Sequence, residues 1–128
     1  MSFIKFTVRP VLLATAWISL SEFARNEYLL QSKWIRHYAD MGLVFPAESV
    51  NGMVWGLWSL LFAIAIYWLS RKYTIVQTAL FLWFTEFLMM WVVTGNLGVL
   101  PFSILGWAIP LSLLETFVAT WLVARYSD

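Results

Sequence analysis

Long apolar runs separated by short polar breaks dominate the pattern of this chain. Three runs, at about residues 51–69, 74–93 and 100–124, contain two charged side chains between them, Glu86 and Glu115. A hydrocarbon core of about 30 Å requires roughly 20 helical residues. Each of these runs therefore predicts one membrane-spanning helix.

The N-terminal run is shorter and more polar than the other three. Its uncharged part covers residues 10–21, so a span at about 10–30 must include Glu22 and Arg25. The alternative is a cleaved signal peptide, because basic residues precede this short apolar stretch. We favour a retained helix, because the small-residue pattern expected at a cleavage site lies inside the apolar run rather than after it. The prediction is one integral membrane domain, residues 1–128, with four spans.

The breaks between the runs predict how the helices are connected. Those at residues 70–73 and 94–98 are short, so neighbouring helices should form antiparallel hairpins. The longer piece, residues 27–45, carries apolar side chains at helical spacing, at Leu30, Trp34, Tyr38 and Met41. It predicts an amphipathic helix on the membrane interface that ends at Phe45-Pro46, because a residue before proline avoids the helical region. The alternative is that the first helix continues into water.

The expected fold class is therefore all-α: a four-helix transmembrane bundle, up-down-up-down, with an interfacial amphipathic helix between the first two spans. Composition supports this class. Hydrophobic residues make up 62% of the chain and charged residues 12%, against about 45–50% and about 25% in soluble proteins. A chain this short cannot bury so much apolar surface, so a soluble or disordered protein is excluded, and the lipid bilayer is the first expected partner.

Charge and cysteine content exclude several further classes. The net charge of +1 provides no basic field for nucleic acid. The chain contains no cysteine, which excludes thiolate metal sites and thiol catalysis. No residue pattern indicates a metal or identifies a cofactor.

The distribution of basic residues predicts the orientation of the chain. With four spans, five Lys and Arg residues fall on the side that holds both termini: Lys5, Arg9, Arg71, Lys72 and Arg125. The other side holds fewer basic residues, and acidic residues dilute them. Since cytoplasmic loops carry an excess of Lys and Arg, both termini are expected in the cytoplasm.

Three predicted spans carry a stripe of small or polar residues at helical spacing. In lipid, such stripes allow close approach of helix backbones and indicate the faces that pack together. The stripes are Thr15, Ser19, Glu22 and Asn26; Gly52, Gly56, Ser59 and Ala63; and Ala108, Ser112, Glu115 and Ala119.

The intramembrane carboxylates are the strongest indication of chemistry. Glu22, Glu86 and Glu115 are expected at similar depth, in a central slab roughly 10 Å thick. A carboxylate there costs about 2.5–3.5 kcal/mol on insertion scales, and neighbouring carboxylates repel, so we expect at least one to be protonated at neutral pH. Arg25 is the nearest cation to Glu22, and Asn26 can donate to the same carboxylate. These five residues form the predicted ligand or proton site, with structural hydrogen bonding between helices as the alternative.

Three classes of function remain open. We favour a small non-enzymatic subunit or interaction protein of a larger membrane complex, with other membrane subunits or copies of itself as partners, because no catalytic motif is present. The first alternative is a small oligomeric transporter, coupled to protons or cations through the intramembrane glutamates. The second is an enzyme acting on a lipid or quinone through Glu22, Arg25, Glu27 and His37. His37, the single histidine, is expected on the surface.

Overall fold

A computed structural model describes residues 2–127, and within this range the chain is all-α and contains no strand. It forms five helical rods, three of them assembled from segments of different helical type. The rods are η1 (Ile4–Val8), α1 (Arg9–Glu22) and η2 (Phe23–Leu29); α2 (Gln31–Asp40); α3 (Ser49–Ser70); α4 (Ile75–Trp83), η3 (Phe84–Leu88) and α5 (Met89–Asn96); and η4 (Phe102–Ile104) with α6 (Leu105–Tyr126).

Three rods are long and apolar enough to cross a membrane: Ser49–Ser70, Ile75–Asn96 and Phe102–Tyr126. They coincide with the three long apolar runs, and their boundaries differ from the predicted ones by one to three residues. The chain is thus a small multi-pass membrane protein with three candidate spans. The N-terminal rod is also continuously helical from Ile4 to Leu29, and it carries the charged residues that set it apart in the sequence.

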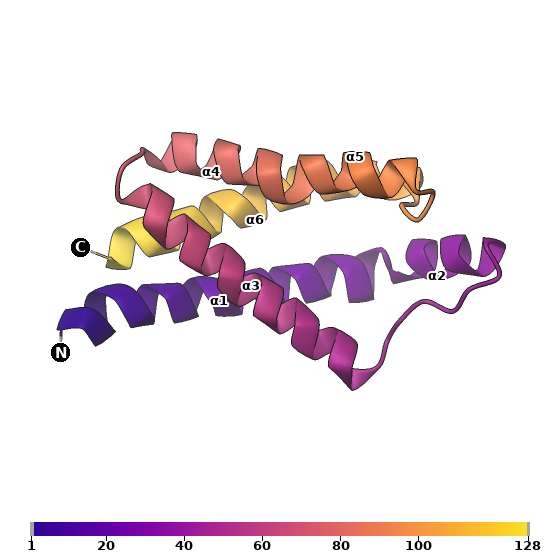
Figure 1. Ribbon diagram of the computed structural model, residues 1–128, viewed down its shortest axis with the longest axis horizontal. Helices are drawn as coiled ribbons and strands as arrows, with labels where there is room; N and C mark the ends of the chain where they lie inside the picture. The colour runs from indigo at the N-terminus through magenta and orange to yellow at the C-terminus, as the bar shows by residue number, and fades with distance from the viewer. Residues whose placement is uncertain (1, 128) are drawn as a thin grey trace.

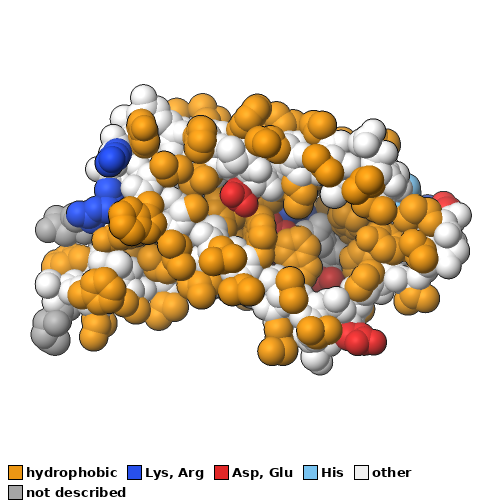
Figure 2. Space-filling view, viewed as in Figure 1, with side chains coloured by type: hydrophobic (Ala, Val, Ile, Leu, Met, Phe, Trp, Pro, Cys, Tyr) orange, Lys and Arg blue, Asp and Glu red, His pale blue; other side chains and the backbone are white. Residues whose placement is uncertain are grey.

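The rods lie roughly along one axis, except α3, which crosses α1 diagonally (Figure 1). Helix α1 packs on α3 and on α6, and α6 also packs on α4 and α3. Both chain ends and the turn between α3 and α4 lie at the same end of the molecule (Figure 1). The visible Lys and Arg side chains gather mainly at that end, and hydrophobic side chains cover most of the rest of this face (Figure 2).

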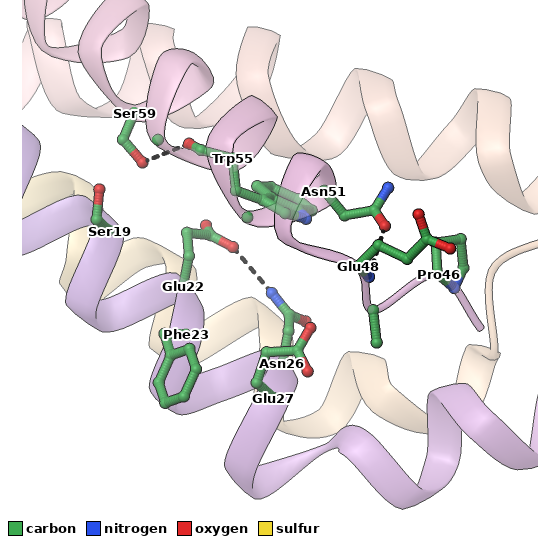
Figure 3. A pocket seen from close by; sticks show the side chains of 13 residues that line it. Ser19, Glu22, Phe23, Asn26, Glu27, Pro46, Glu48, Asn51, Trp55 and Ser59 are labelled. Atoms are coloured by element: carbon green, nitrogen blue, oxygen red, sulfur yellow. Dashed lines mark hydrogen bonds between the residues drawn. The ribbon is translucent and has the colours of Figure 1, made fainter.

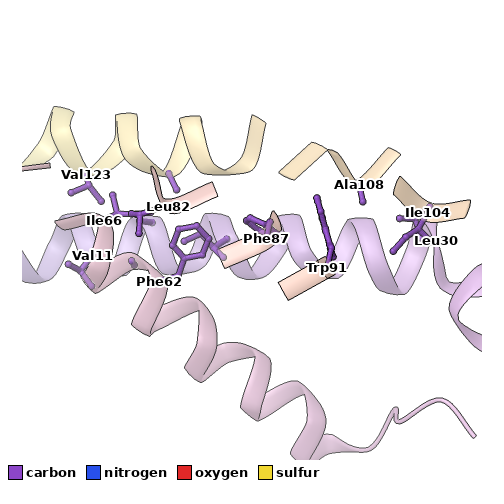
Figure 4. Close-up of a cluster of buried hydrophobic side chains, with 14 of the residues drawn as sticks. Val11, Leu30, Phe62, Ile66, Leu82, Phe87, Trp91, Ile104, Ala108 and Val123 are labelled. Carbon is purple, nitrogen blue, oxygen red and sulfur yellow. The ribbon is translucent and has the colours of Figure 1, made fainter. Parts of the chain in front are cut away.

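The core runs along the middle of the bundle, where side chains from all the long rods meet (Figure 4). The α6 stripe faces this core as predicted, since Ala108, Ser112, Glu115 and Ala119 are all buried. The α3 stripe is only half confirmed. Ser59 and Ala63 are buried, but a Cβ added at Gly52 or Gly56 would meet no atom within 4 Å. The N-terminal half of α3 therefore does not pack closely against this chain.

Helix α2 ends earlier than predicted, which corrects the expected boundary at Phe45-Pro46. The helix ends at Asp40 and is followed by Gly42, whose φ is +75°. The Gly42 amide donates to the Ala39 carbonyl and the Leu43 amide to the Tyr38 carbonyl. This pair of bonds is the Schellman motif, which ends a helix at a glycine in the left-handed conformation. The same arrangement at Gly98 explains why α5 runs on to Asn96, three residues into the expected break.

Of the three π-helical segments in the described residues, η2 and η3 lie beside predicted site residues, and the sequence pattern did not predict them. Segment η2 contains Arg25, and η3 contains Glu86 and Phe87. In η2 the Leu30 amide donates to the Arg25 carbonyl over 2.8 Å, the five-residue spacing of a π-helix. Such turns occur often at functional sites in helices, and both lie beside the carboxylates that the sequence singles out.

Candidate functional site

A buried ion pair lies at the junction of α1 and η2. Arg25 Nη2 lies 2.7 Å from both Glu22 Oε1 and Glu22 Oε2, and Asn26 Nδ2 donates to Glu22 Oε2 over 2.9 Å. The exposed fractions of Glu22 and Arg25 are 5% and 6%. The predicted contact between these two charges is confirmed. Three donor contacts, two from Arg25 and one from Asn26, therefore converge on the Glu22 carboxyl group.

Glu115 approaches the same arginine from the opposite helix. Its Oε1 lies 3.8 Å from Arg25 Nη1, and its side chain is fully buried. The close packing of α1 on α6 produces this meeting, and Trp17 Nε1 supports it by donating to the Glu115 backbone carbonyl over 2.9 Å. Arg25 thus lies between two carboxylates that are 93 residues apart in the chain.

Hydrogen bonding at this centre is incomplete. Among the described residues, Arg25 Nη1 and both carboxyl oxygens of Glu115 are buried and make no hydrogen bond. An unpaired buried polar group typically costs about 1–3 kcal/mol, and more when it is charged. The 3.8 Å separation between Arg25 Nη1 and Glu115 Oε1 is too long for a hydrogen bond, so this contact satisfies neither atom. The centre therefore keeps free hydrogen-bonding capacity on Arg25 and Glu115.

An aromatic ring also contacts the Arg25 guanidinium. The Arg25 guanidinium lies 5.3 Å from the centre of the Phe87 ring, within the range of a cation–π contact. Phe87 belongs to η3 and packs on Phe62 and Trp91, with centroid distances of 5.9 and 5.8 Å. The ring that faces Arg25 thus belongs to a continuous aromatic cluster, which limits the positions open to the guanidinium.

A cavity of about 380 Å³ opens beside Glu22, between η2 and the N-terminal half of α3. Figure 3 shows Glu22 and Asn26 on one wall, with Trp55 and Asn51 of α3 opposite them. Gly52 and Gly56 line the same space, so the unpacked part of the α3 stripe is explained. The crossing of α3 over α1 separates the two helices at this end and leaves the cavity open (Figure 1).

A second cavity of about 420 Å³ adjoins the first and shares six lining residues with it: Glu22, Asn26, Glu27, Pro46, Asn51 and Trp55. Arg25 lines this second cavity, together with aromatic side chains from four segments: Trp34, Tyr38, Phe45, Trp55 and Trp91. Because the lining residues are shared, we treat the two spaces as one site and name it the η2 cavity. On the face in Figure 2 the molecule is hollowed, with acidic side chains in the hollow and at its rim.

Helix α2 closes the outer end of the η2 cavity. Trp34 Nε1 donates to Asn26 Oδ1 over 3.1 Å, so Asn26 connects α2, which forms a lid over the cavity, to Glu22. Trp34 and Tyr38 pack on Phe45, with centroid distances of 5.7 and 5.1 Å. The apolar face predicted for residues 27–45 therefore covers a cavity within the protein.

The structure does not bring Glu86 into this centre. Glu86 is half-buried on η3, and within residues 2–127 its side chain makes no hydrogen bond or ion pair. His37 lies outside the cavity lining, where its Nε2 is 2.7 Å from the Gly98 carbonyl. Four of the five predicted site residues thus lie together: Glu22, Arg25 and Asn26 on the N-terminal rod, and Glu115 on α6.

Sequence reasoning missed the aromatic wall of the site. Tryptophan is common near the ends of membrane-spanning helices, so the sequence positions of Trp34, Trp55 and Trp91 do not indicate a shared site. The signal that distinguishes them is their arrangement around one polar centre, which requires the packing of α2, α3 and α5.

Comparisons of the chain with protein families, curated proteins and solved structures find no match.

Proposed function

We propose that this chain is a four-span integral membrane protein that binds an amphipathic ligand in the η2 cavity and acts as a small carrier. The N-terminal rod is the fourth span in this proposal. Its contacts with α3 and α6 place it beside the candidate spans. Glu22 and Arg25 are buried in the bundle and pair with each other, which offsets part of the cost of charges in a membrane.

The observation that carries the proposal is the unsatisfied Arg25 Nη1 group, on a side chain that lines the cavity and faces the unsatisfied, buried Glu115 carboxyl group behind it. A purely structural network gains stability only when all its members are hydrogen-bonded. Here the network is incomplete where it meets a cavity large enough for a small ligand. A binding role accounts both for the incomplete hydrogen bonding and for the cavity beside it. Exchange of a proton at Glu115 would couple ligand binding to the proton gradient, and a second copy of the chain would complete the pathway.

A stability measurement tests this proposal. Octylamine, octanol and octanoate have the same chain and differ in charge, and each is added to the protein in nanodiscs. We expect at least one of them to raise the melting temperature, since a ligand at 100 times its Kd stabilises by about 2.7 kcal/mol. Glu115→Gln should weaken the effect, and Glu86→Gln is the matched control. If none of the three shifts the melting temperature, the binding role is wrong.

A second candidate is the favoured function from the sequence, a non-enzymatic subunit of a larger membrane complex. Its specific support is the open surface at Gly52 and Gly56, where another helix can approach the α3 backbone closely. Purification in mild detergent followed by mass measurement of the intact particle distinguishes the candidates. A hetero-complex of defined composition favours the subunit role, and a small homo-oligomer favours the carrier.

The proposed topology places both termini in the cytoplasm, because the basic residues gather at the end that holds them. Since the chain has no cysteine, single-cysteine variants report accessibility directly. Lys72→Cys, in the exposed turn between α3 and α4, should resist an impermeant thiol reagent added to intact cells. Glu48→Cys, exposed before α3 at the opposite end, should react. The reverse pattern would invert the orientation.

A further inference from the structure

We infer that the ligand of the η2 cavity is an amphipathic organic cation that also carries a hydrogen-bond acceptor, such as an ester of a quaternary ammonium alcohol. This inference rests on the proposed binding function and adds the chemical class of the ligand. Three independent features of the lining support it: the balance of charge, the aromatic wall, and the free donor on Arg25.

The charge balance of the lining is negative. Three carboxylates line the η2 cavity, those of Glu22, Glu27 and Glu48, against one basic residue, Arg25. Arg25 is already engaged by Glu22 at 2.7 Å and faces Glu115 at 3.8 Å. Glu27 and Glu48 form no ion pair with any described residue. The Glu48 side chain caps the N-terminus of α3, whereas Glu27 has no such partner among the described residues. An anion would therefore meet the like charge of Glu27, and a neutral ligand would desolvate that carboxylate without pairing it, so a cation is favoured.

The aromatic wall suits the same kind of ligand. Trp34, Tyr38, Trp55 and Trp91 line the part of the cavity between η2, α2, α3 and α5. Aromatic faces attract a cation through their quadrupole, and sets of such rings recognise quaternary ammonium groups, whose methyl groups also pack against them. These rings provide an apolar surface and cation binding together, which a purely aliphatic wall cannot provide.

The acceptor requirement comes from Arg25. Its side chain lines the cavity with 6% of its surface exposed, and Nη1 makes no hydrogen bond. A guanidinium donates only, so its free position needs an acceptor oxygen. Arg25 and Glu27 are two residues apart on η2 and line the same cavity. A ligand with an ammonium group and a nearby carbonyl oxygen would place the ammonium group at the Glu27 carboxylate and the carbonyl oxygen at the Arg25 donor.

The test uses three esters that share a hexanoyl chain. Hexanoylcholine is the cation, 3,3-dimethylbutyl hexanoate is its neutral isostere, and 2-sulfoethyl hexanoate is the anion. Binding is measured by titration calorimetry on the protein in zwitterionic nanodiscs, with empty nanodiscs as reference. We expect saturable binding of hexanoylcholine, about tenfold weaker binding of the neutral ester, and no saturable binding of the anion. Hexyltrimethylammonium, which lacks the ester, should also bind about tenfold more weakly.

Two matched pairs of variants locate the site. Glu27→Gln should weaken hexanoylcholine binding about fivefold, and Trp55→Leu about tenfold. The controls are Asp40→Asn and Trp107→Leu, which make the same changes at exposed positions outside the cavity and should leave the affinity unchanged. Equal binding of the cation and its neutral isostere, or no binding of the choline ester, would overturn the assigned class. The ligand-binding proposal itself would still stand if octanol or octanoate stabilises the protein, so the two failures are distinguishable.

Discussion

Arg25→Leu should lower the free energy of unfolding by about 3–5 kcal/mol. The substitution removes the cation between two buried carboxylates, Glu22 at 2.7 Å and Glu115 at 3.8 Å. Glu22 keeps only the Asn26 donor, which cannot offset a buried charge. The cation–π contact of Arg25 with Phe87 is lost as well. Thermal unfolding in detergent, followed by the fluorescence of the tryptophans, measures the effect.

The double variant Glu22→Leu/Arg25→Leu should recover most of this loss, because it leaves no unpaired charge at the junction of α1 and η2. Ligand binding should remain lost in the double variant, since Arg25 lines the η2 cavity. Arg36→Leu is the matched control, because Arg36 is exposed on α2 and forms no ion pair with a described residue. Additive effects of the two single substitutions would show that Glu22 and Arg25 do not stabilise each other, in conflict with the structure.

Phe87→Ala should destabilise the bundle by a similar amount, about 3–5 kcal/mol. Phe87 is fully buried and lies within 6 Å of the rings of Trp58, Phe62 and Trp91. Truncation leaves a void in the aromatic cluster and removes the ring that faces the Arg25 guanidinium. The effect is measured by thermal unfolding under the same detergent conditions.

Phe84→Ala is a close control for this substitution. Phe84 lies three residues earlier in the same π-helical segment, and half of its surface is exposed. The free energy of unfolding should fall by less than about 1 kcal/mol, because removal of this outward-facing ring leaves no internal void. A small effect of Phe87→Ala, equal to that of Phe84→Ala, would show that the aromatic cluster does not hold the centre of the bundle together.

The sequence by itself determined the class of the protein and the positions of its three candidate spans. Uninterrupted apolar runs of this length have few other stable forms, because a membrane-spanning helix satisfies all its backbone hydrogen bonds internally. The contact between Glu22 and Arg25 was also predictable, since residues three apart lie on nearly the same face of a helix. The burial of the Ala108, Ser112, Glu115 and Ala119 stripe followed from the preference for small residues at helix contacts.

The composition of the site was decided by the tertiary structure. Glu86 and Glu115 are equivalent in the sequence, each the single charge in an apolar run. Helix α6 packs on α1 and brings Glu115 to Arg25, whereas η3 turns Phe87, the residue after Glu86, toward the same guanidinium. Adjacent helical residues point roughly 100° apart, so the rotation of η3 about its own axis selects whether Glu86 or Phe87 meets Arg25. That rotation depends on long-range packing.

The cavity likewise depends on helix packing over the whole bundle. Its existence follows from the angle at which α3 crosses α1, which leaves Gly52 and Gly56 unpacked beside Glu22. Its lid follows from the early end of α2 at Gly42, which lets Phe45 fold back onto Trp34 and Tyr38. Local sequence patterns set which residues prefer a helix or a turn, but crossing angles and the placement of a lid are set by side chains far apart in the chain, which only the folded bundle brings together.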